Sequence, residues 1–199
     1  MMLKNQKAKI VYFVLTVLVF LIGSCDLYKE KTYDISGADL IACKQFEDSV
    51  FYNVSTVNLA DIDTSLTHEL VPNNVKRISD SLQQKGNIIK ADQDTAYLVT
   101  LSSEDTTYIL LETEIKSFIV FCTRPIGLNL LEESGEFVPV EDDIMPLETV
   151  SGCQVIQDNG QVEPRIKFRR QYKVKDVRIL LQLFKTEQTK TDRFNLTIK

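Results

Sequence analysis

Hydrophobic and polar residues alternate with a period of two along much of the chain. This alternation predicts β-strands, because successive side chains of a strand point to opposite faces. Strand-like patterns occur at 51–59, 96–101, 107–115, 117–123, 176–184 and 193–199. The segment 117–123 is almost continuously apolar, which is typical of a strand that is buried on both faces. The charged stretch 185–192 predicts a hairpin between the last two strands.

One segment repeats its apolar residues at the spacing of an α-helix. The stretch 72–87 places three apolar side chains on one helical face, namely Val75, Ile78 and Leu82. Asn73 or Asn74 would cap its N-terminus, and Gly86 stands where a left-handed residue commonly ends a helix. Several short strands and one helix predict a mainly β fold, an antiparallel β-sandwich with one short helix. The alternative is an α+β sheet with the helix on one face.

A different apolar pattern opens the chain. Residues 1–9 are polar and include three lysines, and residues 10–22 are apolar except for Thr16 and a tyrosine hydroxyl. Two small residues, Gly23 and Ser24, follow, and this order is typical of a secretory signal peptide. At about 1.5 Å per residue the apolar run spans roughly 20 Å, less than the ~30 Å hydrocarbon core of a bilayer. We therefore expect a cleaved leader and not a membrane span.

The cysteine directly after this leader indicates how the mature protein is held. Ile22-Gly23-Ser24-Cys25 resembles the lipobox of bacterial lipoproteins. The resemblance implies that the Cys25 thiol receives a diacylglycerol and that the bond between Ser24 and Cys25 is cut. Each buried methylene contributes about 0.8 kcal/mol, so two or three acyl chains would hold the protein on a lipid bilayer. The implied location is the cell envelope, lipid-anchored to a membrane and either periplasmic or surface-facing.

The sequence divides into three parts on this interpretation. Residues 1–24 are the lipoprotein signal peptide, residues 25–36 form a polar tether, and residues 37–199 form a single β-rich ectodomain. The tether is charged and polar, as expected for a segment that separates a folded domain from the bilayer.

Charge is distributed unevenly within the predicted ectodomain. No Lys or Arg lies between residues 124 and 165, whereas 165–175 is strongly basic. If this segment is extended, one face carries Arg165, Lys167, Arg169, Lys173 and Lys175. Such a face would bind an anionic envelope glycan or lipid phosphate. The alternative is a solvated sheet face, or a strand paired beside the acidic segment so that the charges compensate.

The overall charge excludes one class of partner. Removing the three leader lysines from 23 basic residues leaves 20, against 28 acidic residues. A nucleic-acid-binding domain is expected to be basic, so we expect no nucleic acid partner.

Three cysteines remain once Cys25 is lipidated. An exported chain lies in an oxidising space, where one disulfide is expected. We favour Cys122 with Cys153, because Cys122 ends a buried strand and Cys153 follows a Ser-Gly turn signal. This bond would close a loop of about 30 residues and stabilise the fold by roughly 3–4 kcal/mol. The alternative is that these two and Cys43 are buried, reduced thiols.

Several three-residue segments carry an Asp before a Ser or Thr. Asp48-Ser49-Val50, Asp94-Thr95-Ala96 and Asp105-Thr106-Thr107 resemble an O-glycosylation sequon of exported proteins of the Bacteroidota. The resemblance implies sugar attachment at Ser49, Thr95 and Thr106. Asp80-Ser81-Leu82 also matches, but it lies within the predicted helix. The alternative is capping and turn chemistry, since these residue types favour such positions.

The chain offers few catalytic candidates. His68 is its single histidine, and the sequence contains neither a G-x-S-x-G elbow nor a glycine pattern for nucleotide binding. We predict no cofactor, no metal and no enzymatic activity. The expected function is a binding or structural role, with the bilayer as one partner and an anionic envelope glycan or another envelope protein as a second. The alternative is an envelope glycan hydrolase that uses paired carboxylates.

Overall fold

A computed structural model describes residues 37–48, 50–62, 70–91, 95–142, 153–187 and 192–199. Contacts within the chain group Ile35–Lys199 into one compact unit. The predicted signal peptide, the lipobox and the tether lie outside the described residues.

Most of the described strands belong to two sheets. The larger sheet has the order β1-β3-β12-β5-β10-β7. Its strands are β1 (Tyr52–Ser55), β3 (Ala96–Thr100), β12 (Arg193–Ile198), β5 (Ser117–Cys122), β10 (Phe168–Lys173) and β7 (Val140–Asp142). The smaller sheet has the order β2-β4-β11-β6, with β2 (Ile88–Lys90), β4 (Thr106–Glu112), β11 (Arg178–Phe184) and β6 (Gly127–Leu131). A separate hairpin consists of β8 (Gln154–Ile156) and β9 (Val162–Pro164).

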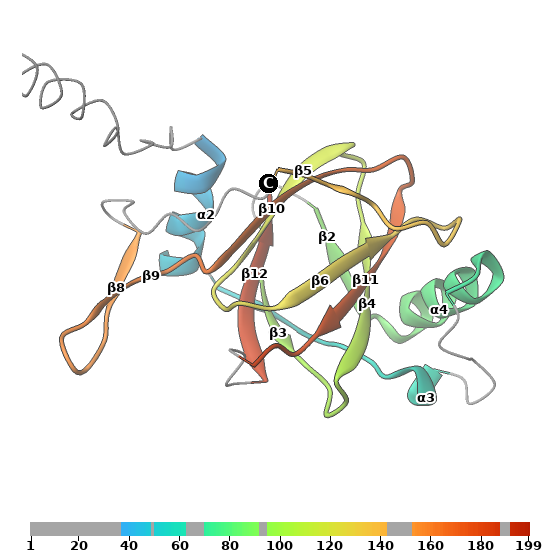
Figure 1. Cartoon of the computed structure of the whole chain (residues 1–199), viewed down its shortest axis with the longest axis horizontal. Coiled ribbons are helices and arrows are strands. Elements are labelled where there is room, and N and C mark those ends of the chain that lie inside the picture. Colours follow the sequence, from blue (N-terminus) through green and yellow to red (C-terminus); the bar gives the residue numbers. More distant parts are fainter. Residues whose placement is uncertain (1–36, 49, 63–69, 92–94, 143–152, 188–191) are drawn as a thin grey trace, which may run out of the picture. The chain divides into compact units, whose positions relative to one another are not determined.

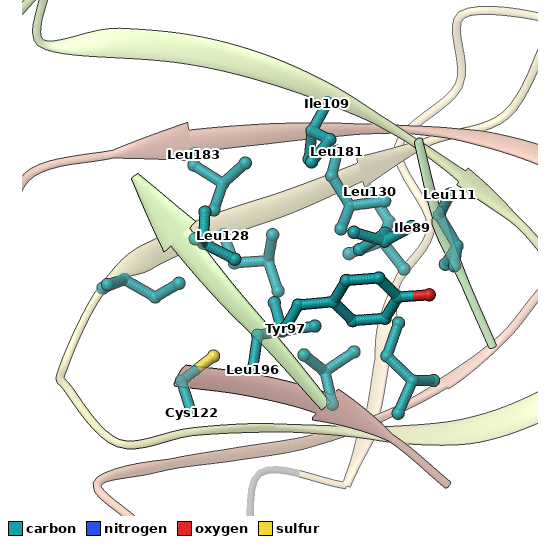
Figure 2. Packing of buried hydrophobic residues seen from close by; sticks show 14 of the residues in the cluster. Ile89, Tyr97, Ile109, Leu111, Cys122, Leu128, Leu130, Leu181, Leu183 and Leu196 are labelled. Atoms are coloured by element: carbon teal, nitrogen blue, oxygen red, sulfur yellow. The ribbon is translucent and has the colours of Figure 1, made fainter. Parts of the chain in front are cut away.

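The inner faces of the two sheets share one apolar core, so the predicted mainly β sandwich is confirmed. Most strand pairs are antiparallel, and two pairs at sheet edges, β1 with β3 and β2 with β4, are parallel. Figure 2 shows the Tyr97 ring of β3 among aliphatic side chains of this core. Its hydroxyl accepts the backbone N–H of Lys90 in β2 at 2.8 Å, so one side chain links the two sheets.

The predicted helix is present as α4 (Pro72–Lys85), which packs on the outer face of the smaller sheet with the short α3 (Leu59–Ile62) beside it (Figure 1). The three predicted apolar residues are completely buried, and Gly86 ends the helix in the left-handed region with φ 73°. The predicted cap is wrong. Val71 occupies the N-cap position without a side-chain hydrogen bond, and Pro72 begins the helix, so Asn73 and Asn74 lie inside its first turn.

The predicted hairpin between the last two strands is also wrong. β11 pairs with β4 and β6 in the smaller sheet, whereas β12 pairs with β3 and β5 in the larger sheet. The chain therefore crosses from one sheet to the other between these strands. Alternation predicts which side chains share a face of a strand, but it does not identify the neighbouring strand.

A second long helix, α2 (Gly37–Asp48), was not predicted. It covers the outer face of the larger sheet, where Ala42, Cys43 and Phe46 pack on Phe121 of β5. Figure 1 shows α2 and the β8–β9 hairpin on one side of the sandwich and α4 on the other. The short strands β2, β6, β7, β8 and β9 were not predicted either.

Candidate functional site

The basic segment 165–175 does not form the continuous face that the sequence predicted. It includes β10 and the residues that flank this strand, and Phe168 and Tyr172 point into the core between the sheets. Lys173 and Lys175 are exposed. The other three basic side chains of the predicted face have partners from α2 or from the β8–β9 hairpin.

Arg169 is buried and is not part of an exposed basic face. Its Nε donates to Oδ1 of Asp39 in α2 at 2.6 Å, and the two side chains are only 6% and 2% exposed. The guanidinium also lies 5.9 Å from the centre of the Phe121 ring, within cation–π range. Arg169 therefore holds α2 against the larger sheet, and its assignment to the anion-binding face is wrong.

The disulfide joins Cys43 of α2 to Cys153, which directly precedes β8. The predicted bond between Cys122 and Cys153 is therefore wrong. Successive residues of β5 point to opposite faces, so Phe121 faces α2 while Cys122 faces the core between the sheets. The Cys122 thiol is free and completely buried, and burial raises its pKa well above the ordinary value for a cysteine.

A pocket of about 200 Å³ lies where α2, the β8–β9 hairpin and the ends of β5 and β12 meet. Phe46 comes from α2, Glu163 from β9, and Arg124 from the segment that follows β5. The remaining polar side chains of its wall include Arg165, Lys167 and Asn195. We call this site the basic pocket. It combines two residues of the predicted anion-binding face with two, Arg124 and Asn195, that sequence reasoning missed.

The basic side chains of the pocket differ in how far their charges are compensated. Arg165 donates from Nη1 to the backbone oxygen of Phe46 and from Nη2 to Glu47, both at 3.1 Å. Its Nε is buried and has no hydrogen-bond partner within the described part of the chain. Lys167 forms an ion pair with Glu163. Arg124 is exposed and makes no ion pair with any residue that the structure describes.

A second pocket, of about 420 Å³, lies at the end of the smaller sheet. Arg178 in its wall bonds to Asp80 of α4 and to Glu133, and these two carboxylates raise the pKa of the guanidinium. The acids of this wall are Glu112, which ends β4, and Glu114, which lies two residues further along the chain.

Two of the three predicted glycosylation residues belong to the described part of the chain. Thr95 is half-buried and its backbone oxygen accepts the Thr197 hydroxyl, while Thr106 is half-buried at the start of β4. Ser49 lies outside the described residues, as does His68. Ser81 lies within α4 and is half-buried.

Among the described residues, no cluster of three or more His, Cys, Asp or Glu side chains could hold a metal ion. Within the same part of the chain, no helix is both long enough and apolar enough to cross a membrane. Comparison with models of protein families found no match to this chain, and comparison with curated proteins found none either.

Proposed function

We propose that the protein is a lipid-anchored component of the cell envelope whose β-sandwich has a binding or structural role, without catalysis. The observation that carries the proposal is the disulfide between Cys43 and Cys153. Structural disulfides persist in oxidising compartments and are rare in the cytosol of most organisms. A chain with this bond is consistent with the export signal and the lipobox at its N-terminus.

The position of α2 supports the same proposal. Gly37 begins α2 only twelve residues after Cys25. At ~3.3–3.6 Å per residue, a segment of this length reaches at most about 40 Å. An acyl anchor on Cys25 would therefore keep the sandwich close to the bilayer. A force on the anchor would act on α2 first. This helix is held to the rest of the domain by the disulfide and by the buried ion pair of Asp39 with Arg169.

The anchor can be tested by measuring the intact mass of the protein isolated from membranes. We expect a chain that has lost residues 1–24 and gained the mass of a diacylglycerol on Cys25. The Cys25→Ala variant should remain an uncleaved, unacylated precursor. The matched control is Cys122→Ala, which also removes one thiol and should keep the acyl mass. An unmodified thiol at position 25, or an intact leader on the isolated wild-type protein, would refute the proposal.

A further inference from the structure

The basic pocket brings three basic side chains, Arg124, Arg165 and Lys167, together with one acid, Glu163. We propose that it binds a single phosphate group. Its volume of about 200 Å³ is below the ~300–1,000 Å³ of pockets that enclose whole small-molecule ligands. A site of this size would hold one charged group, while the rest of the ligand stays outside.

The charge of the pocket matches a phosphate. Arg124, Arg165 and Lys167 line it together with one acid, Glu163, which leaves a net charge of +2. Glu47 binds Arg165 from outside the pocket wall, is 49% exposed, and reduces the charge of the wider surroundings to +1. A phosphate diester carries one negative charge and a monoester about 1.5 to 2 at neutral pH, so either would be neutralised.

The hydrogen-bond donors also favour a multi-oxygen anion. The two outer nitrogens of Arg165 bond to Phe46 and Glu47, so its guanidinium charge is held in place at the pocket wall. The side chains of Arg124 and Asn195 make no hydrogen bonds with the residues that the structure describes, and they add donors to the pocket wall. Arginine binds phosphate oxygens with several parallel hydrogen bonds.

The pocket depends on the disulfide. Phe46 belongs to α2, and Glu163 belongs to the hairpin that follows Cys153. The bond between Cys43 and Cys153 connects these two walls, which are otherwise more than a hundred residues apart in sequence. Without it, α2 can separate from the hairpin, and Arg165 would lose the two groups of α2, the Phe46 oxygen and Glu47, that hold its guanidinium.

This inference deepens the proposed binding role and rests on it, since a protein held near a bilayer is surrounded by phosphate groups. The phosphate would come either from a lipid head group or from free phosphate in the envelope. Titration calorimetry on the full chain in neutral maltoside micelles, at low ionic strength, distinguishes the two. The probes are inorganic phosphate and sn-glycero-3-phosphoglycerol, which is the soluble head group of phosphatidylglycerol, with acetate as the comparison anion.

We expect saturable binding of at least one phosphate compound, about tenfold or more tighter than acetate. Tighter binding of the glycerol diester identifies a lipid head group as the ligand, and tighter binding of inorganic phosphate identifies free phosphate. The inference is overturned if neither compound saturates the protein below about 10 mM, or if acetate binds equally well. An acylated protein that fails this titration would lose this inference alone, because the mass measurement tests the anchor independently.

Variants locate the binding site. Arg124→Gln and Asn195→Ala should each weaken phosphate binding by about tenfold, because each removes a donor from the pocket wall. Lys173→Gln is the matched control, since Lys173 is exposed on β10 and lies outside the pocket, and it should change affinity less than about twofold. An equal loss of phosphate affinity in this control would show that diffuse charge attraction causes the binding, and it would refute a phosphate site in the basic pocket. The double variant Cys43→Ala/Cys153→Ala should lose binding while its circular dichroism spectrum still shows the β-fold.

Discussion

Replacing Asp39 by asparagine would leave the Arg169 guanidinium buried without its countercharge. The two side chains are 2% and 6% exposed and their atoms are 2.6 Å apart, so solvent cannot replace the lost partner. Removal of one partner from a buried ion pair costs about 3–5 kcal/mol. Single domains have a free energy of unfolding of about 5–15 kcal/mol, so Asp39→Asn should remove a large fraction of it.

Urea unfolding followed by circular dichroism measures this loss. We expect Asp39→Asn to lower the midpoint strongly while the slope of the transition stays unchanged, because the same surface is exposed on unfolding. The control is Asp192→Asn. Asp192 pairs with Lys185, but it is 66% exposed, and surface pairs contribute only about 0–1 kcal/mol.

A second variant separates the unpaired charge from a general loss of packing. In Asp39→Leu/Arg169→Met both charges are absent, and apolar replacements of buried ion pairs are often neutral or stabilising. This double variant should therefore be more stable than Asp39→Asn. The reasoning is refuted if Asp39→Asn loses no more than the Asp192→Asn control, or if the double variant is the least stable of the three.

Three further predictions concern other contacts of the fold. The disulfide closes a loop with a sequence separation of 110, so Cys43→Ser/Cys153→Ser should lower the free energy of unfolding by about 4–5 kcal/mol. Equal stability of the wild-type protein under reducing and oxidising conditions would contradict this prediction. Burial raises the pKa of Cys122, so iodoacetamide should label this thiol only in denaturant. The thiol ionises at lower pH in the unfolded chain, so the free energy of unfolding should fall above about pH 8.5, and Cys122→Ala should lack this decline. Glu132 is 7% exposed, and its carboxylate accepts two backbone N–H groups of the β10–β11 loop at 2.8 and 3.0 Å. In urea unfolding, Glu132→Ala should lower the free energy of unfolding by about 2–4 kcal/mol, whereas Glu136→Ala, at an exposed residue, should lower it by less than about 0.5 kcal/mol.

The elements that depend on local periodicity were predictable from sequence. The central strands β4, β5, β11 and β12 fall within a few residues of their predicted ranges, since alternation is a property of consecutive residues. The face of α4 was predicted for the same reason, because residues three and four apart share one side of a helix.

α2 gave no such signal because its apolar residues lie on both its buried and its exposed face. Its buried face contains Asp39, and two of its large apolar residues, Leu40 and Ile41, are 53% and 51% exposed. The ion pair and the disulfide that hold this helix use partners more than a hundred residues away. No window of neighbouring residues contains that information.

The sequence alone determined the mainly β class, the principal strands and the helix at 72–85, because each is encoded within short segments. The leader with its lipobox pattern stays a prediction. Only the tertiary structure decided which strands pair, which cysteines bond and which basic residues stay accessible. Arg124 and Asn195 belong to one pocket because β5 and β12 are neighbours in the larger sheet. Such a placement follows from contacts between distant segments, and those contacts form only when the whole chain folds.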